Sequence, residues 1–593
     1  MTRASLLLLL LLLAACSDDG SGDEAQDGPD DGDGGGSAGE GAAPSDDGDP
    51  GDGAGEPTGD PDIAVLSPQE HLTRASIALR GVRPALDELE AVAEDPRYVE
   101  AIIDFYLTTK NFGRTVREIH EEALLTGVDP AIYPAGFPAI GALAGRDLQE
   151  INTSVVEAPL RLIEHVVMSD RPYGEIVTAD YTYGDDIVAT VWGLDYDDSG
   201  PAWQQTQYQD GRPTAGILSD SFIFTRHSTT FSNKSRGRAN AVSRALLCYD
   251  FLSRELPVDS GIDLADEDAV LEAVTNNPTC VGCHAALDPL AAYFASYYPI
   301  YVPATIDDYP FSVYEPTFRN VFSVTDPDYF GMAQGGIVEL GQAMAEDPRF
   351  SSCAARRFYS FLTQTELEDV PPAVATRLQA VLVDSGMDAK ALAKAVVMSD
   401  EFRASHAETD EKAEALVGLK RVRPRQLARM VERLTGYRWR TSLPIDLGGY
   451  GEVGDIDLMS DALFGFKVLA GGIDSTSVTR PSHTTNATAM LVVEQLAARA
   501  ADHVVEADLE EGDRGQRKLL NLVDADDSDE ALLLDQLVEL QLRLYGQTLE
   551  RDDPMVQQAL ALHQGAREST NDGRRAWTIT LYAMLQDIRM THY

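Results

Sequence analysis

The residues of this chain best suited to chemistry lie in the stretch NPTCVGCHAALDP, from Asn277 to Pro289. It contains Cys280, Cys283 and His284, and so two of the five cysteines in the chain. A C-x-x-C-H pattern is the attachment motif of c-type haem. Two thiols reach the vinyl groups on one edge of the porphyrin, and the adjacent imidazole turns beneath the iron as an axial ligand. The pattern predicts one covalent haem c, held by the two cysteines and ligated by His284.

Three other kinds of site use the same residue types. A zinc ion could be bound by Cys280, Cys283, His284 and one further cysteine. However, adjacent Cys283 and His284 diverge along a helix, which makes tetrahedral binding by both awkward. A redox-active dithiol normally follows a strand in a βαβ unit, which the surrounding sequence does not predict. A structural disulfide within the C-x-x-C pair suits an oxidising compartment. The sequence leaves these alternatives open.

The first residues of the chain indicate export. Arg3 precedes an apolar run at residues 6–13, and the sequence LAAC follows at residues 13–16. This order is typical of a secretory signal peptide, and the run is too short to cross a bilayer as a helix. The LAAC ending resembles a bacterial lipobox. It implies a lipoprotein signal peptide at residues 1–16 and a lipid on Cys16 that anchors the protein to the cell envelope, on the periplasmic side of the outer membrane or at the cell surface. The alternative is an ordinary secretion signal with an incidental cysteine.

The charge of the chain excludes one class of partner. The formal net charge is −50, from 97 acidic and 47 basic residues. Residues 17–62 contain sixteen acidic residues and no Lys or Arg, and they predict a disordered, extended tether rich in Gly and Asp. Binding to nucleic acid requires clustered Lys and Arg on the surface. We therefore expect no nucleic-acid partner.

Beyond the tether, apolar residues recur at helical spacing and strand signals are few, which predicts a mainly α, multi-lobed protein. A capping box at Ser67–Glu70 predicts the start of the first helix. We expect an N-terminal helical domain at 63–212, a domain with the C-x-x-C-H motif at 213–408, and a C-terminal helical domain at 409–593. Three of the helices that the periodicity predicts lie at Arg238–Leu256, Pro371–Val383 and Asp529–Tyr545.

Two further cysteines, Cys248 and Cys353, flank the motif. Because an exported protein rarely leaves two thiols unpaired, we expect a disulfide between them. This bond would close a long loop that contains the whole motif, and long loops gain the most from closure in the chain-entropy model. The alternative is two buried cysteines that act as small apolar residues.

The middle of the chain resembles a known family, the large exported bacterial cytochrome-c-like multidomain proteins of unknown function found in planctomycetes and myxobacteria. These proteins carry a His, an Arg-Gly pair, C-x-x-C-H followed closely by Asp-Pro, and then a Gly-x-x-Glu-Leu helix with a Cys after it. The residues that match in order are His227, Arg236, Gly237, Cys248, Cys280, Cys283, His284, Asp288, Pro289 and Cys353. The resemblance implies a cytochrome-c-like haem domain embedded in a helical protein. One difference from the family is the sequence LAAYFASYYPIYVP after Asp-Pro, where the family usually has Gly-Phe and a Glu-Asn-Phe-Asp sequence. The side chains that line that side of a haem must therefore differ.

The ligand on the far side of the iron decides the chemistry of a haem. The resemblance makes His227 the first candidate, and Met332, in the loop text YFGMAQGG, is the second. His227 is otherwise a polar loop residue with satisfied hydrogen bonds. Arg236 and Arg238 could pair with haem propionates, since a guanidinium binds carboxylates in a bidentate manner, or they could be ordinary surface arginines.

These residues favour electron transfer at the cell envelope, with an unidentified redox protein as partner and the lipid anchor as the contact with the membrane. The outer domains are large for a simple electron carrier. A haem-dependent envelope oxidoreductase is therefore the second hypothesis, and whether the protein is an enzyme stays open. The third is a non-catalytic envelope scaffold in which the C-x-x-C pair is structural.

Overall fold

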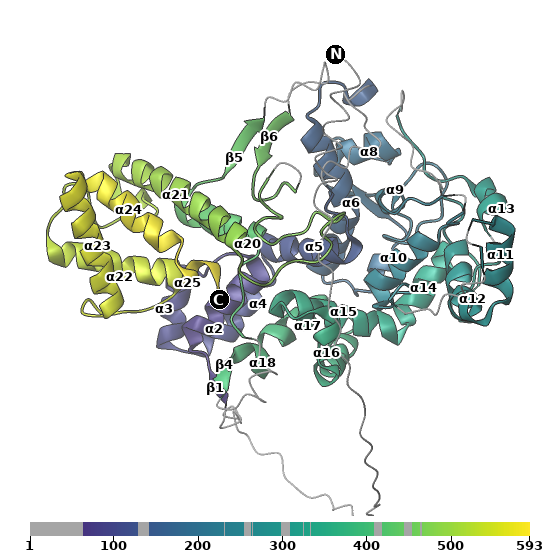
Figure 1. Cartoon of the computed structure of the whole chain (residues 1–593), viewed down its shortest axis with the longest axis horizontal. Coiled ribbons are helices and arrows are strands. Elements are labelled where there is room, and N and C mark those ends of the chain that lie inside the picture. Colours follow the sequence, from purple (N-terminus) through teal and green to yellow (C-terminus); the bar gives the residue numbers. More distant parts are fainter. Residues whose placement is uncertain are drawn as a thin grey trace, which may run out of the picture. The chain divides into compact units, whose positions relative to one another are not determined.

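The computed structural model describes residues 63–128, 141–230, 232–253, 262–263, 265–297, 309–323, 325–332, 334–407, 418–443, 453–462 and 465–593. The predicted signal peptide, Cys16 and the acidic tether lie outside these residues. Within them the protein is mainly helical, as the periodicity predicts (Figure 1). None of the described helices is both long enough and apolar enough to cross a membrane.

The first helices begin where the sequence predicts. Ser67 caps the first of them: its Oγ accepts a hydrogen bond from the amide of Glu70, and the Ser67 amide donates to the Glu70 carboxylate at 2.9 Å. This is the predicted capping box. The helices of this part are α2 (Pro68–Arg80), α3 (Leu86–Glu94), α4 (Tyr98–Tyr106), α5 (Lys110–Leu124), α6 (Leu148–Met168), α7 (Glu175–Thr178) and α8 (Asp186–Trp192), with a 3-10 turn η1 (Gly141–Leu143).

The middle of the chain is built from shorter helices. They are α9 (Ser221–Arg226), α10 (Arg236–Leu247), α11 (Glu267–Asn276), α12 (Pro278–Ala292), α13 (Arg319–Phe322), α14 (Ile337–Glu346), α15 (Pro348–Thr363), α16 (Pro372–Asp384), α17 (Ala389–Val397) and α18 (Asp400–Arg403), with 3-10 turns η2 (Pro316–Phe318) and η3 (Leu367–Asp369). The helix predicted from Arg238 to Leu256 ends early, because Cys248 has a left-handed backbone (φ 50°) that an α-helix cannot continue through.

The C-terminal part contains α21, the longest of the described helices. The helices of this part are α20 (Pro424–Thr435), α21 (Ala487–Glu510), α22 (Glu530–Tyr545), α23 (Pro554–Thr570), α24 (Gly573–Leu585) and α25 (Ile588–Thr591), with a 3-10 turn η4 (Arg514–Gln516). Helices α22, α23, α24 and α21 pack in that order, each against the next (Figure 1).

The described strands form three antiparallel pairs. β2 (Thr182–Gly184) pairs with β3 (Gln204–Thr206), and β5 (Arg440–Leu443) pairs with β6 (Val453–Asp457). β1 (Ile63–Val65) pairs with β4 (Ala404–Ala407), with Ile63 opposite Ala407. This last pair brings the start of the folded chain against a segment more than three hundred residues later.

Two hydrophobic clusters make up the core. The first extends from Leu72 to Phe402, and the second is formed by residues from Val422 to Met590 together with Ile77 of α2. The predicted boundary between residues 212 and 213 falls inside the first cluster, where Tyr173 lies 5.4 Å from Phe350, measured between ring centroids. The predicted boundary at 408 and 409 falls between the two clusters.

A disulfide links Cys248, at the end of α10, to Cys353 in α15. The S–S distance is 2.07 Å and the two Cα atoms are 5.3 Å apart. This is the pairing expected from the sequence. The bond spans 105 residues and encloses α12, which carries the C-x-x-C-H motif.

A buried histidine in the C-terminal cluster predicts loss of stability in acid. His563 of α23 is fully buried 4.1 Å from Trp577 of α24, between ring centroids, and its Nε2 makes no hydrogen bond to any described residue. Burial, with a smaller effect of Arg567, lowers the pKa of His563 to about 4. The unfolded chain has a histidine pKa near 6.5, so between about pH 6.5 and pH 4 it takes up a proton that the folded chain does not. The contribution of His563 to stability is complete above pH 6.5 and is lost as the pH falls.

We expect the variant His563→Leu to reduce this pH dependence. Its free energy of unfolding, measured with urea between pH 7.5 and 4.5, should change less steeply than that of the wild type, by about 1.4 kcal/mol per pH unit. The exposed His406 supplies the control, because His406→Gln should leave the slope unchanged. Equal slopes for His563→Leu and the wild type would contradict the assignment.

Candidate functional site

The C-x-x-C-H motif lies at the start of α12. Asn277 caps this helix by accepting a hydrogen bond from the amide of Thr279 at 3.0 Å, and proline occupies the first turn. Cys283 and His284 therefore follow Cys280 by three and four residues on a helix. This spacing places each of them on the same side of the helix as Cys280. The helix and its cap at Asn277 were not predicted from the sequence; they are findings of the structure.

Both thiols of the motif are half-buried. Cys283 packs against the first hydrophobic cluster, with Sγ 3.9 Å from the carbonyl oxygen of Phe251. Neither Cys280 nor Cys283 forms a disulfide, so the alternative of a disulfide within the motif is not what the structure adopts. The zinc alternative would need a further ligand, and Cys248 is already bonded to Cys353. The described residues contain no group of three or more His, Cys, Asp and Glu side chains placed to hold a metal ion.

A carboxylate orients the histidine of the motif. His284 donates from Nδ1 to Oδ1 of Asp288 at 3.0 Å, one turn further along α12. Arg236 of α10 binds the same carboxylate in a bidentate manner, at 2.6 Å and 2.9 Å. With Nδ1 occupied, Nε2 is the nitrogen of His284 that can ligate a metal. Histidine ligands in metalloproteins usually have such an outer carboxylate, so this donor set fits an iron-bound imidazole.

Asp288 is charged at neutral pH. Its burial raises the pKa of the carboxyl, but hydrogen bonds from His284 and Arg236 and the positive charge of Arg236 outweigh it, so the net pKa lies below its ordinary value. In the sequence, Asp288 stands out only as a residue of the family resemblance, and its contact with His284 was not predicted. The i, i+4 spacing on a predicted helix could have revealed it.

The structure places His227 in a different environment. It follows α9 as its C-cap, is half-buried, and donates from Nε2 to the carbonyl of Leu124, at the end of α5, at 2.9 Å. Burial, reinforced by Arg226, lowers the pKa of His227 to about 3, so the side chain is neutral. Ligation of a metal through Nε2 would require this hydrogen bond to break. Its role as an axial ligand stays a prediction.

The structure also shows the surroundings of Met332, Arg236 and Arg238. Met332 is 57 % exposed in the loop before α14. Arg236 is engaged with Asp288, and the buried Arg238 donates to the carbonyl oxygens of His227, Phe224 and Tyr297. Burial lowers the pKa of Arg238 to about 9. Arg238 is therefore not the ordinary surface arginine of the alternative, because backbone carbonyls hold its guanidinium inside the protein, and its pairing with a haem propionate stays a prediction.

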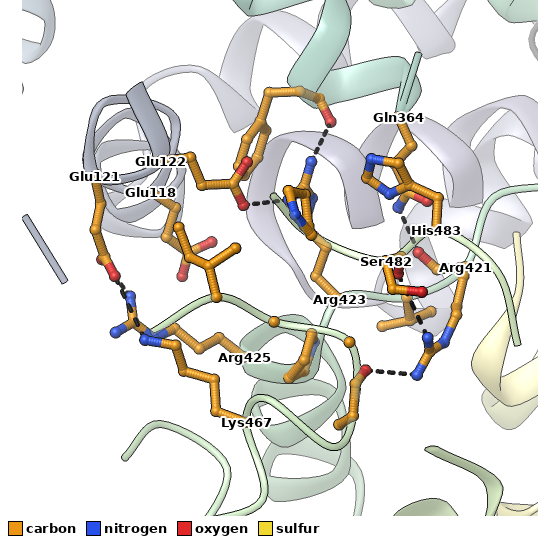
Figure 2. Close-up of a pocket in the computed structure, with 18 residues that line it drawn as sticks. Glu118, Glu121, Glu122, Gln364, Arg421, Arg423, Arg425, Lys467, Ser482 and His483 are labelled. Atoms are coloured by element: carbon orange, nitrogen blue, oxygen red, sulfur yellow. Dashed lines mark hydrogen bonds and ion pairs between the residues drawn. The ribbon is translucent and has the colours of Figure 1, made fainter. Parts of the chain in front are cut away.

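A second polar site, missed by the sequence analysis, lies where α5 meets the segment that begins α20. Figure 2 shows three glutamates of α5 facing cations around a cavity of about 50 Å³. Each carboxylate has an ion-pair partner there: Glu118 pairs with Arg429, Glu121 with Arg425 and Lys467, and Glu122 with Arg423. A cavity of this size holds only a few water molecules, so this group mainly joins the two parts of the chain.

Comparison of the chain with models of known protein families, with curated proteins and with solved structures finds no match. The function is therefore argued from the residues of the site.

Proposed function

We propose that this protein is a c-type cytochrome of the bacterial cell envelope that transfers electrons to or from another envelope protein. Cys280 and Cys283 attach one haem c, His284 is its axial ligand, and a lipid on Cys16 anchors the chain. The observation that carries the proposal is the Arg236–Asp288–His284 chain of hydrogen bonds beside two half-buried thiols that form no disulfide.

Each of these residues has a defined task. Asp288 holds the proton of His284 on Nδ1 and fixes the direction of the ring, which leaves Nε2 as the ligand. Arg236 fixes the Asp288 carboxylate in turn. A bound haem would supply one-electron redox chemistry at this position.

The surroundings of α12 support an apolar ligand. Four large apolar side chains in the sequence around the motif are more than half exposed: Leu252, Leu271, Val321 and Met332. Leu252 follows Phe251, whose carbonyl contacts Cys283, and Leu271 lies on α11, which packs against α12. Leu252 and Leu271 therefore place exposed apolar surface on segments that contact α12, which is typical of a binding surface.

The test is covalent haem itself. The full-length protein should be expressed in a host with working haem-attachment machinery and in a matched host without it. We expect haem staining at the position of the protein after denaturing electrophoresis, together with a Soret band, in the first host alone. Absence of covalent haem from the first host would overturn the proposal and favour the envelope scaffold.

One observation favours the second candidate, a haem-dependent envelope oxidoreductase. The Nε2 atom of His227 is already bonded to Leu124, and Met332 is exposed. If neither residue ligates the iron, a substrate can bind there. A high-spin spectrum, carbon monoxide binding without denaturation and peroxide-dependent turnover would favour the oxidoreductase. A six-coordinate low-spin spectrum that changes in a His227→Ala variant would favour the carrier.

The Asp288 carboxylate should set the reduction potential of the site. We expect Asp288→Asn to raise the midpoint potential by about 60 mV, which corresponds to a tenfold change for one electron, because a negative charge behind His284 stabilises the ferric state. The matched variant Arg236→Gln removes the cation from the same carboxylate and should lower the potential. Spectroelectrochemical titration measures both. Shifts in the same direction would show that the carboxylate does not act through His284.

A further inference from the structure

A cavity reaches the disulfide that joins α10 to α15. It has a volume of about 420 Å³, within the size range of small-molecule sites, and lies between α5, the end of α10, α15 and the loop at residues 479–483. Cys248 lines the cavity and is half-buried, whereas Cys353 is 1 % exposed. A small molecule in this cavity therefore approaches the disulfide from the side of Cys248.

Each cysteine of the disulfide has an arginine one helical turn away. Arg244 precedes Cys248 by four residues at the end of α10, and Arg357 follows Cys353 by four residues on α15. Nε of Arg357 donates to the carbonyl oxygen of Ala245 at 2.7 Å, and Sγ of Cys353 lies 3.7 Å from the same oxygen. A guanidinium and a sulfur atom of the disulfide thus meet at one carbonyl group.

The cavity is rich in cations for so acidic a chain. Five arginines and four carboxylates line it, whereas acidic residues outnumber basic ones about two to one in the whole sequence. Two of the carboxylates pair with arginines distant from the disulfide: Glu122 with Arg423, and Glu368 with Arg480. Asp250 acts on the charge of Arg244, but its Oδ1 accepts hydrogen bonds from Asn240 and from the amide of Leu252. Three arginines take part in no ion pair among the described residues: Arg244, Arg356 and Arg357.

Arg357 is charged at neutral pH. Burial lowers its pKa to about 10, while Tyr173 and Glu122 oppose the shift and Arg244 and Arg356 add to it. A thiolate released at Cys353 would lie beside this charge, and a neighbouring arginine lowers the pKa of a thiol. A thiol of lower pKa is the better leaving group in exchange with another thiol, so the surroundings of Cys353 favour attack on the disulfide at Cys248.

We infer that Cys248 and Cys353 form a redox-active disulfide, which exchanges with a small thiol that carries a carboxylate and binds in the arginine-lined cavity. The thiolate of the small molecule attacks Sγ of Cys248, and the disulfide breaks to release Cys353 as a thiolate. A second small thiolate attacks the small-molecule sulfur of the mixed disulfide and releases Cys248. Two electrons and two protons thus pass to the two cysteines, and the small thiols leave as their own disulfide. The inference uses no residue of the C-x-x-C-H motif and goes beyond the proposed cytochrome.

The rate of reduction of the folded protein tests the inference. The full-length protein in detergent is treated with 3-mercaptopropionate, which carries a carboxylate, or with cysteamine, which carries an ammonium group. Alkylation and peptide mass spectrometry follow Cys248 and Cys353 separately from Cys280 and Cys283, so the readout is the same with or without haem. We expect 3-mercaptopropionate to reduce the disulfide at least about tenfold faster per thiolate at low salt, and the difference to disappear at high salt.

The net charge of the protein makes this test selective. The chain carries a formal charge of −50, so general electrostatic attraction would favour the cationic cysteamine. Equal or faster reduction by cysteamine would overturn the inference. A disulfide that neither thiol reduces until the protein is unfolded in urea would overturn it as well.

Variants locate the effect at the arginines of the cavity. Arg357→Gln removes the charge beside Cys353 and should lower the equilibrium constant for reduction about tenfold, equivalent to about 30 mV for two electrons. Arg244→Gln keeps the buried Arg357 and should slow reduction by 3-mercaptopropionate about tenfold, so it tests the site even if Arg357→Gln does not fold. Arg377→Gln on α16 is the matched control, because Arg377 is 52 % exposed and lies outside the cavity. If Arg244→Gln is reduced as fast as Arg377→Gln, the inference fails.

Discussion

Replacement of both Cys280 and Cys283 by serine is expected to abolish haem staining on a denaturing gel. The hydroxyl of serine has nearly the shape of the thiol but does not add to a vinyl group, so neither thioether can form. The two side chains are only half-buried and form no disulfide, so their replacement should leave the helical content unchanged. Haem staining and far-ultraviolet circular dichroism, measured on the same preparation, check both parts.

The control for this prediction lies inside the motif. A methyl group at Gly282 would meet no atom within 4 Å, so Gly282→Ala keeps both thiols and His284 without a clash. This variant should retain covalent haem at the level of the wild type. Staining that persists in the double serine variant would mean that the haem is attached elsewhere, and the role given to the motif would be wrong.

Removal of Arg429 should destabilise the protein by about 3–5 kcal/mol, the usual cost of leaving one partner of a buried ion pair alone. Arg429 binds Glu118 through two contacts, at 2.5 Å and 3.2 Å, and both side chains are 13 % exposed. Burial raises the pKa of Glu118, but Arg429 and its neighbouring arginines outweigh this and keep it below its ordinary value. Arg429→Met would leave this carboxylate buried without its closest cation. Urea unfolding followed by tryptophan fluorescence measures the loss.

A double-mutant cycle separates the pair from its surroundings. The combination of Glu118→Gln with Arg429→Met should be more stable than Arg429→Met alone, because no uncompensated charge remains. Arg97→Met, at an exposed pair with Asp95, should leave stability unchanged and serves as the control. Equal stability of the single and double variants would show that Glu118 and Arg429 are not coupled. Gly81→Ala tests the position of Arg429 in a second way. The Arg429 guanidinium lies against Gly81, whose φ is +64°, so an added methyl group would push that side chain away.

Local features could be predicted because they depend on residues close in the chain. The capping box at Ser67 begins α2, and the helices predicted at Pro371–Val383 and Asp529–Tyr545 are α16 and α22 to within one residue at each end. The sequence did not predict the helix that carries the motif, and the structure shows that α12 holds both cysteines and the histidine. The partner of Cys248 followed from counting thiols, because the motif uses the only other pair outside the first sixteen residues.

Long-range contacts could not be predicted, since periodicity states which face of a helix is apolar but not which helix covers it. Arg236 reaches Asp288 across 52 residues because α10 packs against α12. His227 is bonded to Leu124, 103 residues earlier, which no local pattern indicates. The glutamates of α5 meet arginines in α20 and just before it, more than three hundred residues later.

The sequence by itself determined the helical class of this protein and the group of two thiols and one imidazole, because spacing along a helix is sufficient for both. Only the tertiary structure decided which guanidinium holds the Asp288 carboxylate behind His284, and which carbonyl oxygen accepts the hydrogen bond from His227. Those choices depend on how distant helices pack, and the free energy of that packing is shared among side chains far apart in the chain.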